Sequence, residues 1–355
     1  MKKLSVCVLF GGVSPEHEVS LRSGESVLNH IDHSKYNVFP VGITKDGDWI
    51  HYTGKDYSLL PTGEWKDHPG NRRAAISPVR GQGLLSFEGD CVVRERIDVV
   101  FPVLHGENGE DGTIQGLLQL AGIPYVGPHV SASAVAMDKT LTKLVAGQAG
   151  IPQADWLLVR RGELDCHMDT VVTELEKRFA YPMFVKPAGT GSSVGVSKAA
   201  NQEELKQGLL SAAVYDEKVL VEEFIRGKEI EVAVMGNDSP VASVCGEIDS
   251  GAEFYDYDAK YITDTSVAYI PARISEEAAE QVRDMAVRVY QSVGCQGLSR
   301  VDFFVKEDGQ PVFNEINTIP GFTSISMYPK LFAASGIPYS QLIDELIRLA
   351  VEDEE

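Results

Sequence analysis

Residues 299–323 read SRVDFFVKEDGQPVFNEINTIPGFT, in which two runs rich in β-branched and aromatic residues flank Asp308 and Gly309. Asp-Gly between two such runs is the strongest short-range signal for a β-hairpin with a two-residue turn. With Asp308 and Gly309 as that turn, Glu307 pairs with Gln310 and the register of the hairpin follows. The stretch therefore predicts two antiparallel strands with defined cross-strand partners.

The predicted register brings four polar side chains together. Asp302 lies opposite Glu315, and Arg300 lies opposite Asn317. Side chains two residues apart on a strand share one face of a sheet, so all four converge on one side of the hairpin. Directly opposed carboxylates repel unless a positive charge lies between them. That charge is either the Arg300 guanidinium, on a solvated sheet face, or a divalent metal ion.

The donor set indicates which metal ion would bind there. Asp302, Glu315 and Asn317 offer two carboxylates and a carboxamide oxygen, with no Cys or His nearby. Such hard oxygen ligands suit Mg²⁺ or Mn²⁺ rather than Zn²⁺. Magnesium held by so few protein groups usually completes its shell with water and substrate phosphates. A metal ion bound to the hairpin therefore predicts a nucleotide site.

Length and composition exclude several classes of protein. The chain has 355 residues, enough for two or three domains, and 43% of them are hydrophobic. Its net charge of −20 argues against nucleic acid or an anionic membrane as a partner. No apolar run approaches the ~18 residues of a transmembrane helix, and the N-terminal apolar run is too short for a signal peptide. The five scattered cysteines lack metal spacing and indicate reduced thiols, so we expect a cytoplasmic protein.

The first part of the chain predicts an open parallel α/β sheet. Glu16 and His105 follow two of the expected strands, where ligands of such sheets bind, although the nearby glycines are also explained by turns alone. Residues 45–95 are polar and irregular, which predicts a hairpin-rich surface insertion. The expected strands are 4–10, 38–43 and 97–104, and the expected helices are 19–31 and 113–120.

The middle of the chain carries a second chemical stretch. After a helix expected at 131–147 and a strand at 180–185, residues 186–196 read KPAGTGSSVGV. A loop of glycines and hydroxyl residues at a hairpin tip can direct backbone N–H groups at phosphates, or it can be an ordinary surface loop. It is no Walker loop, because the lysine precedes the glycines.

The last part predicts a second sheet with flanking helices. Strands are expected at 219–225, 229–235 and 241–245, and an acidic strand end such as 222–225 is a plausible adenine and ribose site. Residues 253–264 have the composition of a mobile lid or of an exposed aromatic loop. Helices are expected at 202–213, 275–293 and 341–351.

Seven motifs in this order resemble the D-alanine–D-alanine ligases of the ATP-grasp superfamily, over nearly the whole chain. They are GGVSPEHEVSL from Gly11, LHGENGEDG from Leu104, MDK from Met137, VKP…GSSVG from Val185, FYDYDAKY from Phe254, SRVD from Ser299 and NEINTIPGFTS from Asn314. The resemblance implies an α/β fold with an N-terminal open parallel sheet domain (1–128). A two-part ATP-grasp fold of α+β domains would follow, central (129–225) and C-terminal (226–355), in a homodimer.

The resemblance also implies the nucleotide site. ATP would lie between two sheet-bearing domains, with Lys139 and Lys186 on its phosphates and the glycine-rich loop over them. Asp302, Glu315 and Asn317 would hold two Mg²⁺ or Mn²⁺ ions. The remaining ATP-binding residues would be Ser192, Ser193, Val194, Glu222, Glu223, Phe224, Ile225, Glu229, Lys260 and Asn314.

The implied reaction joins two D-alanines through a D-alanyl phosphate and supplies the dipeptide for peptidoglycan. Arg300 and the Gly321 N–H would stabilise the tetrahedral oxyanion. The substrates would be held by Glu16, His105, Ser326 and Met327, and Ser192 and Tyr261 would link the lid to Glu16 and close the site against water.

Three alternatives compete with this assignment. Relatives that join D-alanine to D-lactate or D-serine share the ATP motifs, but Tyr261 matches the D-alanine type, whereas lactate-specific relatives carry a His near there that can repel an ammonium nucleophile. A regulatory module without catalysis predicts a substitution at Arg300 or among the three metal-site residues, and none is present. An ATP-grasp carboxylase would need a carrier or biotin domain. The sequence favours the D-alanine–D-alanine ligase.

Overall fold

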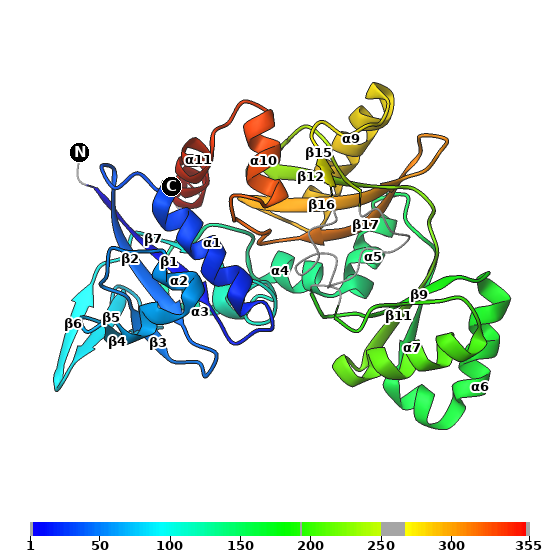
Figure 1. Ribbon diagram of the computed structural model, residues 1–355, viewed down its shortest axis with the longest axis horizontal. Coiled ribbons are helices and arrows are strands. Elements are labelled where there is room, and N and C mark those ends of the chain that lie inside the picture. The colour runs from blue at the N-terminus through cyan, green and yellow to red at the C-terminus, as the bar shows by residue number, and fades with distance from the viewer. Residues whose placement is uncertain (1–2, 192–193, 250–266, 353–355) are drawn as a thin grey trace.

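The computed structural model describes residues 3–191, 194–249 and 267–352, which form three β-sheets in succession along the chain (Figure 1). The first sheet and its helices lie at one end, and the helices α6 (Arg161–Arg178) and α7 (Gln202–Tyr215) lie at the other (Figure 1). None of the helices in the described residues is long and apolar enough to span a membrane.

The first sheet combines a parallel centre with an antiparallel extension. β1 (Leu4–Gly11) pairs in parallel with β2 (Tyr36–Ile43) and with β7 (Val99–Pro102), which confirms the expected parallel sheet. Four further strands extend it antiparallel in the order β2-β3-β4-β5-β6. These are β3 (Trp49–His51), β4 (Arg72–Ile76), β5 (Leu84–Glu88) and β6 (Cys91–Glu95).

The region 45–95 is more than the expected surface insertion. It supplies those four strands, the helix α2 (Leu59–Thr62) and the 3₁₀ turn η1 (Glu64–Asp67). Trp65, only 1% exposed, packs edge-on against Phe10 at a ring distance of 5.1 Å. A Cβ at Gly42 would lie 2.2 Å from the Trp65 ring, so glycine is required there. The region 45–95 is polar overall, but a few large apolar residues in it complete the core.

The segment expected as one helix from Ser131 to Gly147 is two helices. α4 (Val130–Met137) ends at Asp138, whose φ of −88° and ψ of 103° are extended, and α5 (Lys139–Gln148) begins directly after it. The Asp138 carboxylate accepts hydrogen bonds from the N–H groups of Thr140 and Leu141, which makes it the N-cap of α5. Asp138 therefore breaks the helix and starts a new one.

The second sheet has the order β10-β9-β11-β8, and α6 and α7 cover it together on one side (Figure 1). Its strands are β8 (Trp156–Arg160), β9 (Met183–Pro187), β10 (Ser197–Ala199) and β11 (Lys218–Glu223). The 202–213 helix is confirmed as α7, and its first turn is capped by the Asn201 side chain. The sequence did not predict α6, whose charged residues show little helical periodicity.

The third sheet has helices on both faces because its strand β12 (Lys228–Met235) alternates between two apolar cores. Val232 and Val234 pack with α9 (Glu276–Ser292), while Ala233 and Met235 pack with α10 (Met327–Ala334). The sheet runs β15-β14-β12-β16-β17, and β13 pairs with β12. The other strands are β13 (Val241–Ala242), β14 (Gly246–Asp249), β15 (Val267–Tyr269), β16 (Leu298–Val305) and β17 (Pro311–Asn317).

The β16–β17 hairpin has the predicted partners at its far end but a different turn. Arg300 lies opposite Asn317 and Asp302 opposite Glu315, as expected. The pairing of Glu307 with Gln310 is wrong, because the Lys306 N–H donates to the Gln310 carbonyl and leaves a three-residue loop with Gly309 at φ 85°. A β-bulge at Asn314 adds one residue to β17 and restores the predicted register.

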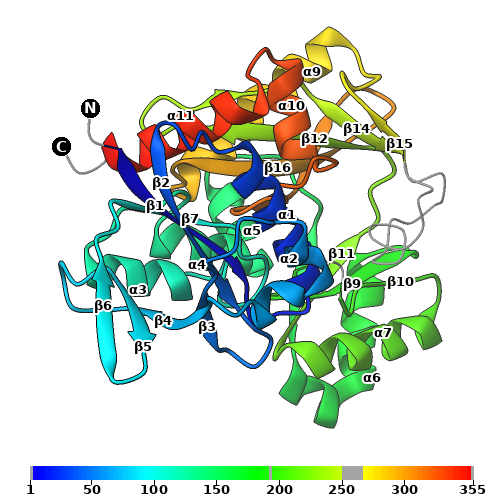
Figure 2. The same cartoon turned by 60° about the vertical axis from the view of Figure 1, so that its left-hand side comes forward.

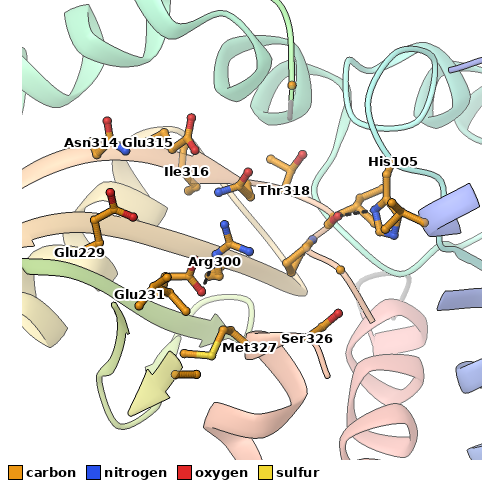
Figure 3. Close-up of a pocket in the computed structure, with 18 of the residues that line it drawn as sticks. His105, Glu229, Glu231, Arg300, Asn314, Glu315, Ile316, Thr318, Ser326 and Met327 are labelled. Carbon is orange, nitrogen blue, oxygen red and sulfur yellow. Dashed lines mark hydrogen bonds and ion pairs between the residues drawn. The ribbon is translucent and has the colours of Figure 1, made fainter. Parts of the chain in front are cut away.

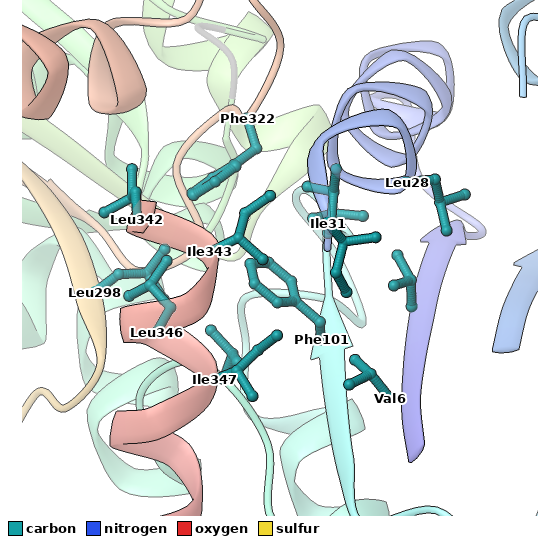
Figure 4. Close-up of a cluster of buried hydrophobic side chains, with 14 of the residues drawn as sticks. Val6, Leu28, Ile31, Phe101, Leu298, Phe322, Leu342, Ile343, Leu346 and Ile347 are labelled. Carbon is teal, nitrogen blue, oxygen red and sulfur yellow. The ribbon is translucent and has the colours of Figure 1, made fainter. Parts of the chain in front are cut away.

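The last helix completes the core of the first sheet. α11 (Tyr339–Glu352) places Ile343, Leu346 and Ile347 against Phe101 of β7 (Figure 4). Leu28 of α1 (His17–His30) belongs to the same cluster. The helices expected at 113–120, 275–293 and 341–351 are confirmed as α3 (Thr113–Ala121), α9 and α11. The domain boundaries at 128 and 225 stay a prediction.

We predict that Leu346→Ala lowers the free energy of unfolding by about 2–5 kcal/mol, because it leaves a cavity between α11 and the first sheet. Leu210→Ala on α7, where the leucine is 53% exposed, should change it by less than about 0.5 kcal/mol. Guanidinium chloride unfolding followed by circular dichroism measures both. A loss below about 1 kcal/mol for Leu346→Ala would show that the α11 contact is not part of a tight core.

Candidate functional site

A cavity of about 1730 Å³ is lined by residues from all three sheets and their loops. We call each sheet with its helices and loops a unit. The first unit contributes Glu16 and His105, the second Lys186 and Glu222, and the β16–β17 hairpin of the third Arg300. Figure 3 shows His105 and Arg300 in this cavity. Such a large cavity between units is where ligands usually bind. It contains most of the predicted site residues that the structure describes.

Arg300 is at the centre of an ion-pair network on the hairpin face. Its Nε and Nη2 each donate to the Asp302 carboxylate at 2.8 Å, and Glu231 of β12 lies 3.3 Å from Nε. Burial alone would lower the pKa of Arg300, but the Asp302 and Glu231 carboxylates raise it well above the ordinary value. Arg300 therefore stays charged and is oriented by two carboxylates, of which Figure 3 shows that of Glu231.

Sequence reasoning missed Glu231. Glu229 and Glu231 are two residues apart, so both lie on one face of β12. Glu231 is directly opposite Asp302 on the neighbouring strand β16. The signal was present as two glutamates two residues apart, but their strand neighbour could not be identified from the sequence.

The donors of the predicted metal site fit Mg²⁺ or Mn²⁺ only with help from a ligand. Glu315 and Asn317 line the cavity, whereas Asp302 is 8% exposed and accepts hydrogen bonds from Arg300 and from the Asn317 side chain at 3.0 Å. No cluster of three or more His, Cys, Asp or Glu side chains suited to a metal ion occurs among residues 3–191, 194–249 and 267–352. Two carboxylates beside an amide suit an ion that shares its shell with phosphates.

Two predicted phosphate-binding lysines lie beside this hairpin. The Lys139 Nζ donates to the Thr190 carbonyl at 2.7 Å and lies 3.8 Å from Glu315 Oε2. The Lys186 Nζ lies 2.6 Å from Glu222 Oε2 and 3.3 Å from Asn314 Oδ1. The bulge at Asn314 thus links the hairpin to β9.

Glu222 is shared by two lysines. Lys143 of α5, which sequence reasoning missed, lies 2.5 Å from Glu222 Oε1. Burial alone would raise the pKa of Glu222, but the charges of Lys143 and Lys186 lower it to about 2. Lys143 follows Lys139 by four residues, so the two lysines lie on one side of α5, and that spacing is the signal that could have found it.

The end of β11 forms one wall of the cavity. Glu223, Phe224 and Ile225 line it together with Glu222, and Glu229 follows on β12. Phe224 stacks on Phe184 with ring centroids 5.9 Å apart, which gives this wall a flat apolar surface. The Glu223 carboxylate accepts a hydrogen bond from the Asp155 N–H at 2.9 Å.

His105 connects the first unit to the loop after β17. One ring nitrogen is 2.9 Å from Ser23 Oγ, and the other is 3.0 Å from the Ile319 carbonyl. Burial alone would lower the pKa of His105, but the nearby Glu110 carboxylate raises it above the ordinary value. Ser23 Oγ also accepts a hydrogen bond from the Phe322 N–H at 3.2 Å, so two contacts hold this loop in place.

Gly321 and Ser326 lie together at the start of α10. A Cβ at Gly321 would lie 2.9 Å from Ser326 Oγ, so a larger residue would displace that hydroxyl. Ser326 Oγ accepts a hydrogen bond from the Thr323 N–H at 3.0 Å. Met327, the first residue of α10, lines the same part of the cavity (Figure 3).

The glycine-rich loop approaches Glu16. A Cβ at Gly191 would lie 2.9 Å from Glu16 Oε2, and one at Gly106 would lie 2.5 Å from the same atom. Val194 follows, with its N–H 3.3 Å from the Gly191 carbonyl. Ser192, Ser193, Lys260 and Tyr261 lie outside the described residues, as does the predicted lid at 253–264.

Comparisons with known proteins cover nearly the whole chain. The family models described as D-ala D-ala ligase N-terminus and C-terminus match residues 5–128 and 145–348. Similar curated proteins include D-alanine–D-alanine ligases of Acetivibrio thermocellus, 53% identical over 99% of this chain and 96% of the relative, and of Caldicellulosiruptor bescii, 51% identical over the same shares.

Solved structures agree with this family. The VanG D-Ala:D-Ser ligase of Enterococcus faecalis has a TM-score of 0.90 at 39% identity and covers 99% of this chain and 100% of its own. The D-alanine–D-alanine ligase of Coxiella burnetii has a TM-score of 0.85 at 36% identity and covers 99% and 96%.

We predict that Glu222→Gln lowers the free energy of unfolding at pH 7 by about 3 kcal/mol, because the buried Lys143 and the partly exposed Lys186 lose their shared carboxylate. The folded-state pKa of Glu222 is depressed from 4.5 to about 2, so the stability from its charge is present above pH 4.5 and is lost as the pH falls toward 2. Thermal unfolding at pH 7, 4 and 3 should show the variant approach the unsubstituted protein.

The matched control is Glu276→Gln, whose carboxylate is 81% exposed, and it should leave the unfolding temperature nearly unchanged at each pH. A Glu222→Gln deficit that stays constant from pH 7 to 3 would contradict the assigned charge state.

Proposed function

The chain belongs to the D-alanine–D-alanine ligase family, and we propose that it joins two D-alanine molecules in an ATP-dependent reaction. The product would be D-alanyl-D-alanine for peptidoglycan precursors, made through a D-alanyl phosphate in a protein of the ATP-grasp fold. The observation that carries the proposal is that one cavity joins Glu16, Lys186 and Arg300, which lie on three different units of the fold.

ATP would bind between the second and third sheets. Lys139 and Lys186 are suited to its phosphates because both ammonium groups line the cavity. The flat wall of Phe184 and Phe224 suits an adenine ring, and Glu229 suits the ribose hydroxyls. The further proposed contacts are Ser192, Ser193, Val194, Glu222, Glu223, Ile225, Lys260 and Asn314.

Asp302, Glu315 and Asn317 would hold two Mg²⁺ or Mn²⁺ ions, the number that the resemblance to the family implies. Ions bound there supply neutralisation of the charge on the phosphates during transfer. Arg300 donates hydrogen bonds to both oxygens of the Asp302 carboxylate. For Asp302 to bind an ion, these oxygens would have to contact the ion as well as Arg300. Glu231, which also lies within ion-pair distance of Arg300, would keep the guanidinium oriented.

The first step transfers the γ-phosphoryl group. A carboxylate oxygen of the first D-alanine attacks the γ-phosphorus, the bond to the bridging oxygen breaks, and ADP leaves with that electron pair. Glu16 would accept the ammonium of this substrate, and His105 lies at the same end of the cavity. The protein contributes mainly position and positive charge to such a step.

The second step forms the peptide bond. The neutral amine of a second D-alanine attacks the acyl carbon, and the bond from this carbon to the phosphate oxygen then breaks in the tetrahedral intermediate. Phosphate leaves with that electron pair and, in the net reaction, with the proton that the nitrogen loses. Arg300 and the Gly321 N–H would stabilise its oxyanion. Ser326 and Met327 would hold the carboxylate of the second substrate, at the N-terminus of α10, where the helix dipole favours negative charge. Ser192 and Tyr261 would link the lid to Glu16 and exclude water.

The identity of the second substrate separates this proposal from its alternatives. One similar solved structure is a D-Ala:D-Ser ligase at 39% identity, whereas curated D-alanine–D-alanine ligases reach 53%. The higher identity supports D-alanine over the resistance-type substrates. Homodimer formation and a cytoplasmic location stay predictions.

We predict that the purified protein releases ADP with Mg²⁺-ATP and D-alanine alone, and forms a product with the mass of D-alanyl-D-alanine. Adding D-lactate or D-serine should leave the D-alanine dipeptide as the main product near neutral pH, and L-alanine should give no product. A dominant mixed product would show that the second substrate is D-lactate or D-serine and not D-alanine. No D-alanine-dependent ADP release would contradict the ligase function.

We predict that Arg300→Lys lowers kcat by about 10²–10³-fold, because a lysine cannot reproduce the guanidinium fork aimed by Asp302 and Glu231. Arg348→Lys on α11, which lies outside the cavity lining, should leave kcat unchanged. Steady-state ADP release measures both, with circular dichroism to verify folding. A folded Arg300→Lys protein with kcat within about threefold of the unsubstituted protein would exclude the oxyanion role.

A further inference from the structure

Lys143 is a buried cation that the proposed reaction does not use. It is 2% exposed, and it is absent from the described residues that line the cavity. A buried ammonium is unfavourable unless a carboxylate compensates it. Its Nζ lies 2.5 Å from Glu222 Oε1, on the opposite carboxylate oxygen from Lys186.

The geometry of the three groups determines the charge that reaches the cavity. Lys186 and Glu222 alone would form a neutral pair, with their charged atoms 2.6 Å apart. Such a pair would attract a polyanion weakly, because the carboxylate would repel it nearly as strongly as the ammonium attracts it. With Lys143 the group carries one net positive charge. Lys186 and Glu222 line the cavity, while Lys143 lies behind them.

The same contacts also fix where the Lys186 ammonium lies. Lys186 and Glu222 come from the adjacent strands β9 and β11 of the second sheet, whereas Lys143 comes from α5, which contacts the hairpin strand β17. A carboxylate held at both oxygens has little freedom to rotate, so Glu222 keeps Lys186 beside Asn314 of the hairpin. Lys143 thereby connects the second sheet to the third.

We infer that Lys143 is a positioning residue that compensates Glu222 from behind, so that Lys186 presents an uncancelled positive charge to the nucleotide phosphates. The inference rests on the proposed function only in that ATP occupies this cavity. It assigns to Lys143 a contribution that grows with the number of phosphates on the ligand, without contact between Lys143 and the ligand.

A purely structural role of the Lys143–Glu222 ion pair predicts a different result. If Lys143 only stabilises the fold, its removal should weaken all ligands of the cavity equally or none of them. If it supplies charge through Glu222 and Lys186, its removal should weaken ATP and ADP but hardly affect adenosine, which has no phosphate. The dependence of the loss of affinity on the number of phosphates therefore separates the structural role from the charge role.

The test compares Lys143→Met with Lys206→Met, which removes the same charge from the exposed face of α7 outside the cavity lining. Isothermal titration calorimetry with Mg²⁺ and without amino acids gives the Kd of ATP, ADP and adenosine. We expect Lys143→Met to raise the Kd of ATP and ADP by about tenfold or more and that of adenosine by less than about threefold. Lys206→Met should leave all three unchanged.

A second variant tests the charge argument and does not require Lys143→Met to fold. Lys143→Met/Glu222→Gln and Glu222→Gln both lack the Glu222 carboxylate, so any contribution of Glu222 itself to ATP binding cancels when these two variants are compared. ATP should bind about tenfold more weakly to the double variant than to Glu222→Gln, which retains both lysines.

Equal losses for ATP and adenosine, unchanged ATP binding in Lys143→Met, or equal ATP affinity in the double variant and Glu222→Gln would each overturn the inference. Since these titrations contain no amino acid, a wrong second substrate would leave the Kd ratios unaffected. Conversely, intact formation of D-alanyl-D-alanine would not rescue the inference if the ratios fail.

Discussion

Charge compensation inside one cavity is the constraint on which the rest of the structure depends. The chain has a net charge of −20, yet its proposed substrate is a polyanion that needs cations. Buried cations persist only beside carboxylates, and each carboxylate weakens the attraction that the cation is there to provide. At Glu222 the structure meets both demands, because Lys143 and Lys186 share one carboxylate. At Arg300 two carboxylates, Asp302 and Glu231, compensate one cation and hold the guanidinium in place.

Sharing of charges also joins separate elements of the fold. Each compensated group draws partners from different elements: β9, β11 and α5 at Glu222, and β12 with β16 at Arg300. Where charges do not join the units, neutral hydrogen bonds do, as between His105 and Ile319 or Ser23 and Phe322. The site is therefore one of the connections between the units.

The hairpin shows how far sequence alone could reach. Cross-strand partners at Arg300 and Asp302 were predicted correctly although the turn was wrong, because the bulge at Asn314 cancels the one-residue error. A bulge has no reliable sequence signal, so the predicted partners of Arg300 and Asp302 are correct because two one-residue differences cancel. Motif order predicted the family, whereas Glu231 and Lys143 were missed because each functions only through a partner brought close by the fold. The break at Asp138 was missed because an apolar, alanine-rich segment hid an N-cap within it.

The position of α11 has a consequence for synthesis of the protein on the ribosome. β1, β7 and α1 leave the ribosome early, whereas α11, which contacts α1 and β7, lies far along the chain (Figure 2). Its side chains Ile343 and Leu346 belong to the core that covers these elements. Because domains tend to fold from the N-terminus during translation, the first sheet has an open apolar face until α11 has been synthesised and docks. Transiently exposed apolar surface promotes aggregation, so the docking of α11 protects the first sheet as well as completing its core.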